Sequence, residues 1–213
     1  MRLHPWTEWI ENIETREGLA RVARRQFLRT TGLLATGALL GVRAVATPAC
    51  VETEVNGEGP FYKAGAPERA VLVERGMPGT RLTLTGRVTG LDCRQLSGAL
   101  VDVWQADAAG EYDNAGFTLR GRLYADRSGL YRLETIVPKR YPVGGTQQFR
   151  PAHLHFKVSA PGFELLTTQL YFPNDPHNAT DSGFRRSLML DPKNGGDGQL
   201  AQFDFVLKPN RRA

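Results

Sequence analysis

Two of the chain's four histidines lie one residue apart in a single alternating run, Arg150-Pro151-Ala152-His153-Leu154-His155-Phe156. Because the side chains of a β-strand alternate between its two faces, His153, His155 and Lys157 are predicted to share one face. Leu154 and Phe156 then point the other way, into a core. Two imidazoles on one strand face are half of a metal site. The same pattern also occurs as a surface feature or as a hydrogen-bonded pair in a core.

Alternating runs on both sides of the histidines predict further strands. In residues 81–88, Leu82 and Leu84 alternate with polar side chains at the period of a half-buried strand. After residue 46 no segment keeps a 3.6-residue apolar period over three turns, and only residues 185–190 suggest a short helix. The other strands are predicted at residues 99–104, 130–136, 165–172 and 202–207. Short strands between turns predict an all-β fold, an antiparallel β-sandwich with long loops.

Length and charge are those of an ordinary soluble domain. The chain has 213 residues, 41% hydrophobic and 23% charged, with a formal net charge of +5. Residues 1–46 hold seven Arg and four Glu, so they account for +3 of that charge and leave +2 for the rest. No Lys/Arg run is interleaved with aromatic residues, so we expect no nucleic-acid partner.

The N-terminus has the layout of an export signal. Arg24-Arg25 precedes a weakly apolar run, residues 30–45, that ends in Ala44-Val45-Ala46. This resembles a twin-arginine signal, which implies the twin-arginine (Tat) export machinery and a periplasmic or otherwise exported protein. The run is too short and too rich in glycine for a stable membrane span. We therefore expect a signal at 1–46 and one catalytic domain at 47–213; the alternative is an amphipathic or disordered tail.

The two cysteines have two interpretations. An oxidising compartment permits a Cys50–Cys93 disulfide, which would pin the start of the mature chain to the domain. Two unrelated thiols are the alternative, because sequence does not give their separation.

The histidine pair lacks an obvious third ligand. His4 lies in the expected signal, so a three-histidine zinc site is available only through His177. Tyr112 lies in the loop at 108–113 and Tyr141 in the loop at 138–145. Taken singly, these are a loop aromatic and a packed residue before a proline.

Five blocks together resemble a known family. In order they are residues 98–104, 107–112, 141–142, 150–156 and 168–172, and they match the intradiol ring-cleavage dioxygenases across residues 50–207. The likeness is to the protocatechuate 3,4-dioxygenase branch. The catechol 1,2-dioxygenase branch carries an additional helical N-terminal domain, for which the mature chain has no room.

The resemblance implies a non-haem ferric ion, Fe(III), and cleavage of a catechol-type aromatic, protocatechuate or a catechol, with O₂ to a cis,cis-muconate-type product. The implied metal ligands are Tyr112, Tyr141, His153 and His155. Tyrosinate is a hard anionic donor that favours Fe(III), and metal charge lowers the phenol pKa from about 10. The implied catalytic residues are Tyr141 as base, Arg150 as the cation that stabilises negative charge on the ring, and Gln169 as a hydrogen-bonding group. Arg150 in a salt bridge and Gln169 as strand structure are the alternatives.

Two other functions stay open on the sequence. One is a non-enzymatic β-sandwich binding module of the transthyretin or carboxypeptidase-regulatory kind, which gives no reason for the two tyrosines. The other is an exported enzyme of the same fold with another metal or substrate. Arg120, Arg122 and Arg140 are candidate cations for a substrate carboxylate, and a homo-oligomer is compatible with the sequence.

Overall fold

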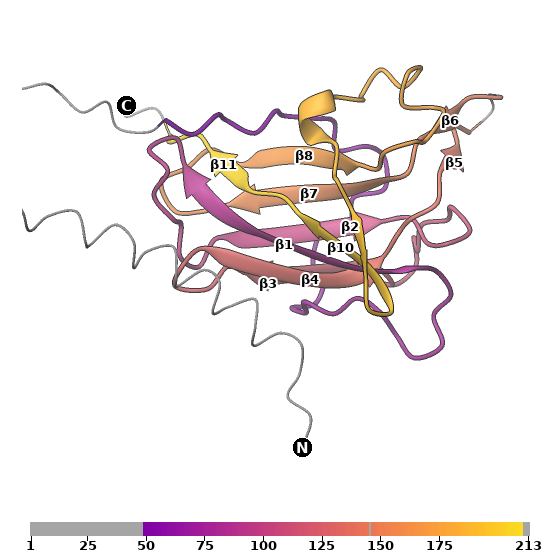
Figure 1. The fold of residues 1–213 in the computed structure, drawn as a ribbon, viewed down its shortest axis with the longest axis horizontal. Helices are drawn as coiled ribbons and strands as arrows, with labels where there is room; N and C mark the ends of the chain where they lie inside the picture. Colours follow the sequence, from indigo (N-terminus) through magenta and orange to yellow (C-terminus); the bar gives the residue numbers. More distant parts are fainter. Residues whose placement is uncertain (1–48, 145, 211–213) are drawn as a thin grey trace, which may run out of the picture. The chain divides into compact units, whose positions relative to one another are not determined.

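The computed structural model describes residues 49–144 and 146–210. In chain order its strands are β1 (Arg81–Gly90), β2 (Leu100–Gln105), β3 (Arg120–Tyr124), β4 (Leu130–Ile136), β5 (Tyr141–Pro142), β6 (Phe149–Arg150), β7 (His153–Ser159), β8 (Leu166–Tyr171), β9 (Lys193–Gly195), β10 (Gly198–Gln202) and β11 (Phe205–Leu207). One sheet has the order β11-β1-β10-β9, with β4 also paired to β1, and the other has the order β3-β2-β7-β8 (Figure 1). The predicted all-β sandwich is confirmed.

The core between the two sheets follows from the alternation of side chains. Leu154, Phe156 and Val158 of β7 are completely buried between the sheets, as are Leu82 and Leu84 of β1. Burying one such side chain contributes about 1.5–3 kcal/mol. The histidines therefore occupy the opposite face of β7, as predicted.

The register of the second sheet decides which side chains flank the histidines. His155 is paired with Trp104 of β2 on one side and with Gln169 of β8 on the other. His153 is paired with Tyr171 of β8. Because a slip of one residue would turn both histidines into the core, the buried leucine and phenylalanine side chains of β7 hold this register.

The predicted last strand is two strands instead of one. Both β10 and β11 run parallel to β1, so the sandwich is not antiparallel throughout. The break between them lies beside Gly86, where an added Cβ would collide with the Phe203 carbonyl oxygen. Asp204 fills the gap in the ladder, because its Oδ1 accepts a hydrogen bond from the Arg87 N–H at 2.8 Å.

Four more strands and a helix differ from the sequence prediction. β3 and β9 were not predicted, and β5 and β6 form a two-stranded ladder where loop was expected. In that ladder Tyr141 lies directly opposite Arg150. The short helix expected at residues 185–190 is a single 3-10 turn, η2 (Arg186–Leu188).

An early segment covers the outer face of the second sheet. The Asn56 N–H donates a hydrogen bond to the Thr167 carbonyl at 2.8 Å, along the edge of β8. From there residues 57–62 cross the outer face of the sheet. We call residues 57–62 the strap. It makes one polar contact to each strand: Gln169 of β8 to the Gly57 carbonyl (2.5 Å), Lys157 of β7 to Glu58 (2.5 Å), Tyr62 to Asp102 of β2 (3.1 Å), and Arg120 of β3 to the Phe61 carbonyl (2.6 Å). The strap buries a sheet face that alternation alone would leave in water.

A disulfide anchors the segment that leads into the strap. Cys50 and Cys93 are bonded, with their Cα atoms 5.3 Å apart. The first of the two interpretations of the cysteines is therefore confirmed. The predicted signal at residues 1–46 lies outside the described residues. Within the described part of the chain, no helix has the length and apolar character to cross a membrane.

Candidate metal centre

The two histidines bring their ring nitrogens together. Both side chains are buried, and the two Nε2 atoms lie 3.0 Å apart. His153 Nδ1 lies 2.6 Å from the Pro151 carbonyl oxygen, which assigns the proton to Nδ1 and leaves Nε2 with a lone pair, within hydrogen-bond distance of His155 Nε2. If two nitrogens each lie about 2.1 Å from one metal ion and the N–metal–N angle is about 90°, the nitrogens are about 3.0 Å apart. The spacing therefore fits two ligands of one metal ion.

Tyr112 is held at the site by a loop built on carboxylates. Asp107 Oδ1 accepts hydrogen bonds from two backbone N–H groups of the loop at 2.7 and 2.9 Å. Asp113 accepts three more on the other side of Tyr112. Gly110 has a φ of +90°, and an added Cβ would lie 2.6 Å from the Arg140 carbonyl oxygen. Glycine therefore allows the loop to pack against the start of β5.

The four predicted metal ligands surround one point. The ring centroids of Tyr112 and Tyr141 are 5.4 Å apart and nearly perpendicular. Tyr141 lies 5.6 Å from His153, and Tyr112 lies 6.2 Å from His155. The structure therefore brings together four side chains that the sequence separates by up to 43 positions.

Burial keeps all four groups neutral in the protein alone. It raises the pKa of Tyr112 and of Tyr141, although the positive charge of Arg150 opposes the rise in both. It also lowers the pKa of His153 to about 4 and that of His155 well below its ordinary value. Among the described residues, neither the Tyr112 hydroxyl nor His155 Nδ1 has a hydrogen-bond partner of normal geometry.

The donor set suits a ferric ion. Buried polar atoms without partners cost free energy, and a cation among them would favour the phenolate forms. Two phenol oxygens and two imidazoles are hard and intermediate donors of the kind iron accepts. In the described residues no three His, Cys, Asp or Glu side chains gather as a metal site. His177 instead stacks on Phe149, with centroids 5.2 Å apart.

Arg150 reaches the site through a network of polar side chains. Its Nε donates to Asp181 Oδ2 at 2.6 Å, and its Nη2 donates to Gln169 Oε1 at 2.7 Å and to Tyr171 Oη at 3.2 Å. Burial lowers the pKa of Arg150, but the hydrogen bond and charge of Asp181 outweigh this and raise it. The guanidinium is thus charged and fixed beside Tyr141, its partner across β5 and β6.

Aromatic side chains close the site from the strap and from β2. Phe61 stacks on Tyr112, with centroids 4.2 Å apart and planes within 14°. The same ring meets Tyr141 edge-on at 5.7 Å. Trp104 stacks on His155 at 4.8 Å. The four predicted ligands therefore sit in a mainly aromatic enclosure.

Of the three candidate carboxylate-binding arginines, Arg122 and Arg140 are engaged away from the site, whereas Arg120 borders it. Arg120 is completely buried, and its guanidinium donates to the carbonyl oxygens of Phe61 and Asp113. Arg122 Nε donates to the Ala66 carbonyl at 2.6 Å. Arg140 lies over the ring of Phe149, 6.0 Å from its centroid. The Arg120 guanidinium also lies over the ring of Tyr112, 5.9 Å from its centroid, so this arginine does contact one of the four predicted ligands.

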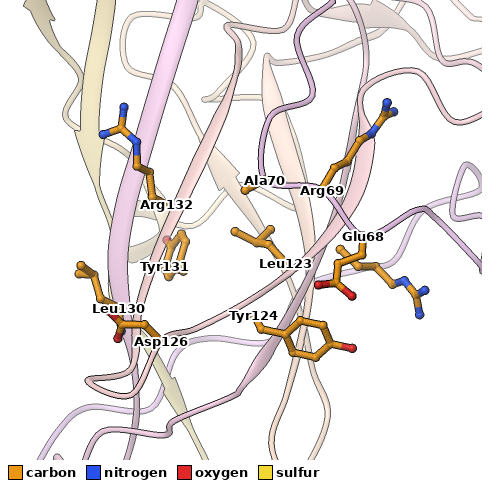
Figure 2. Close-up of a pocket in the computed structure, with 10 residues that line it drawn as sticks. Glu68, Arg69, Ala70, Leu123, Tyr124, Asp126, Leu130, Tyr131 and Arg132 are labelled. Carbon is orange, nitrogen blue, oxygen red and sulfur yellow. The ribbon is translucent and has the colours of Figure 1, made fainter.

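A pocket of about 480 Å³ lies away from the histidines, and none of the four predicted ligands lines it. Its walls come from β3, β4 and the residues before β1, with Leu123, Tyr124 and Tyr131 in the middle (Figure 2). The guanidinium groups of Arg69 and Arg132 point away from these three side chains. We assign this pocket no part in the chemistry.

Sequence reasoning missed several residues that shape the site. Nothing in the sequence marks Phe61 as the neighbour of Tyr112 or Asp181 as the partner of Arg150. Trp104 lies in a predicted strand, and its place beside His155 follows only from the register of the sheet. An aromatic residue after a Gly-Pro turn and an aspartate before Ser-Gly are too common to have marked these positions.

Comparisons with known proteins agree with the geometry. A family model described as Dioxygenase matches residues 57–209. A 6-chlorohydroxyquinol 1,2-dioxygenase of Cupriavidus pinatubonensis is 34% identical over 227 residues, covering 96% of this chain and 82% of the relative. Catechol 1,2-dioxygenase 2 of Acinetobacter lwoffii is 41% identical over 147 residues, covering 60% of this chain and 54% of the relative, so the match spans about half of that protein.

A solved structure is similar over the same region. It is the dioxygenase domain of a dioxygenase carbohydrate-binding protein fusion from Streptomyces sp. SirexAA-E. The sequences are 42% identical and the TM-score is 0.66, with 76% of this chain and 98% of that chain covered. The finer assignment to the protocatechuate branch stays a prediction.

Proposed function

Because the chain belongs to the intradiol ring-cleavage dioxygenases, which act on catechol-type substrates, we propose that it works with a non-haem ferric ion. The proposed ligands are the four converging side chains, Tyr112, Tyr141, His153 and His155. The observation that carries the proposal is the 3.0 Å approach of the two histidine Nε2 atoms, with the ring of Tyr112 next to His155 and the ring of Tyr141 next to His153. A non-enzymatic binding module gives no reason for this convergence.

The chemistry is divided between the ion and the protein. When bound, a ferric ion would supply a Lewis acid that binds the diol and activates its ring toward O₂. We assign Tyr141 Oη the removal of a substrate proton, with Arg150 beside it to stabilise the negative charge that develops on the ring. Gln169 supports this role by holding Arg150, because its Oε1 accepts from Nη2 at 2.7 Å.

Colour and metal content test the ferric site. Tyrosinate bound to Fe(III) absorbs visible light, so the purified protein should be burgundy to brown and contain about one iron per chain. Chelation should bleach it and added iron should restore it. A colourless, iron-free protein from iron-replete cells, which added iron does not restore, would exclude the proposal. Another metal in stoichiometric amount would favour the alternative enzyme.

Substitution of ligands separates the site from the fold. Tyr112→Phe and His155→Ala should bleach or shift the visible band and abolish turnover, while far-UV circular dichroism keeps its β-sheet signal. Tyr124→Phe is the matched control, because Tyr124 is half exposed on β3. An unchanged band in Tyr112→Phe would remove Tyr112 from the ligand set.

The substrate is proposed from the same family. The related proteins named above act on catechol and on 6-chlorohydroxyquinol by their names, and the five sequence blocks resemble the protocatechuate branch. We propose a catechol-type diol, and oxygen uptake with catechol, hydroxyquinol and protocatechuate would rank them. A preference for protocatechuate would require a cation to meet its carboxylate. Arg120 is the candidate beside Tyr112, whereas Arg122 is engaged with the Ala66 carbonyl.

We also propose that the protein is exported by the twin-arginine route. The Cys50–Cys93 bond is consistent with an oxidising compartment. Expression in a bacterial host, followed by separation of periplasm from cytoplasm, tests the route. Changing Arg24 and Arg25 together to Lys should hold the protein in the cytoplasm. Equal export of this double variant would refute the proposed signal.

A further inference from the structure

Lys157 shares the face of β7 with both histidines but has no part in the proposed metal centre. Its Nζ lies 2.5 Å from a Glu58 carboxylate oxygen and 3.8 Å from the centroid of the Tyr62 ring. The Lys157 side chain is only 18% exposed. A charged ammonium group in this position is held by two residues of one short segment, the strap.

The two residues that Lys157 holds flank those that touch the candidate metal centre. Glu58 and Tyr62 bind Lys157, and between them Gly59 and Phe61 face the predicted ligands. A Cβ on Gly59 would lie 3.2 Å from His155 Cε1, so the strap backbone packs directly on that ring. Phe61 stacks on one proposed tyrosine ligand and meets the other edge-on.

We propose that Lys157 is a positioning residue that sets the geometry of the metal centre through the strap. This proposal rests on the proposed function for its metal readouts. An apolar side chain in place of Lys157 would leave the Glu58 carboxylate without its partner and remove the cation over the Tyr62 ring. The strap would then lose its contact with β7, which lies between the residues that bind β8 and β3. Phe61 would no longer be fixed against Tyr112.

A positioning role and a purely structural role predict different changes when Lys157 is lost. If Lys157 only adds stability, its loss lowers the melting temperature and leaves the rings where they are. If it acts through the strap, its loss changes the surroundings of Tyr112 in the folded protein. The stacked Phe61 ring provides the signal, because an aromatic ring shifts the NMR resonances of protons above its face.

The test compares Lys157→Met with Lys208→Met in the purified protein. Lys208 is the matched control, because it pairs with Glu164 at 3.1 Å on another part of the domain. In metal-free Lys157→Met we expect amide hydrogen exchange in residues 57–62 to rise at least tenfold and the ring-current shift of the Tyr112 protons to be lost. In iron-loaded protein we expect a shifted visible band and at least tenfold faster loss of iron to a chelator.

Two further variants keep the test decisive if Lys157→Met does not fold. Glu58→Gln removes the same ion pair from the more exposed side, and should give the same changes. The exchanged pair, Lys157→Glu with Glu58→Lys, should reverse at least half of the change that Lys157→Met causes in amide exchange and in the Tyr112 shift.

The outcomes separate this proposal from the proposed function. Faster exchange in the strap with an unchanged Tyr112 signal would make Lys157 merely structural and overturn the proposal, as would unchanged exchange. If the unsubstituted protein takes up no iron, the ferric function fails, while the metal-free exchange and NMR measurements still decide the role of Lys157.

Discussion

The ion pair between Asp181 and Arg150 allows a quantitative prediction for Asp181→Asn. The Asp181 side chain is only 3% exposed and meets Arg150 Nε at 2.6 Å. Its other oxygen accepts a hydrogen bond from the Gly183 N–H at 2.6 Å. Asparagine retains an oxygen for Gly183 but offers Arg150 a neutral amide. The substitution therefore tests the charge of Asp181 with little change in volume.

The expected loss follows from the burial of both partners. Removing one partner of a fully buried ion pair costs about 3–5 kcal/mol. Arg150 is 21% exposed and keeps its bonds to Gln169 and Tyr171, so we expect a smaller loss, about 2–3 kcal/mol in the free energy of unfolding. In a domain of this size that lowers the melting temperature by about 4–12 °C.

Urea denaturation at neutral pH measures the loss, with the slope of the transition unchanged. Asp191→Asn is the matched control. Asp191 pairs with Lys193 at 2.8 Å, but its side chain is 81% exposed, and we expect a loss below about 0.5 kcal/mol. Equal small losses from both variants would refute the reasoning that Arg150 depends on a buried carboxylate.

Two further predictions concern the backbone and the disulfide. Gly86→Ala should cost about 3 kcal/mol or more in unfolding free energy, because its Cβ would meet the Phe203 carbonyl, whereas Gly144→Ala should be nearly neutral, since nothing lies within 4 Å of an added Cβ. Urea titrations of both variants check this, and equal midpoints would contradict it. The double substitution of Cys50 and Cys93 by Ser should lower the free energy of unfolding by about 2–4 kcal/mol, as expected for a link 43 positions apart. If the double variant has the same melting temperature as the unsubstituted protein, the disulfide contributes nothing to stability.

Much of the sandwich could be predicted because its strands obey a local rule. Alternation in β1, β2, β4, β7 and β8 is a property of neighbouring residues, so the sequence shows it directly. The ladder of β5 and β6 escaped prediction because each strand has two residues, too few for any period. The division between β10 and β11 depends on Gly86, which lies on β1. The sequence around residues 203–204 therefore does not indicate it.

The candidate metal centre was likewise predictable only in part. The sequence by itself determined that His153 and His155 share a face, because alternation needs only the backbone. Together with the motif order, it also selected Tyr112 and Tyr141 as their companions. Only the tertiary structure decided that Arg150 is held by Asp181 and that the strap packs on His155. Those contacts join residues that are distant along the chain. They form only once the packing of the whole domain has set the register of the sheet and the path of the strap.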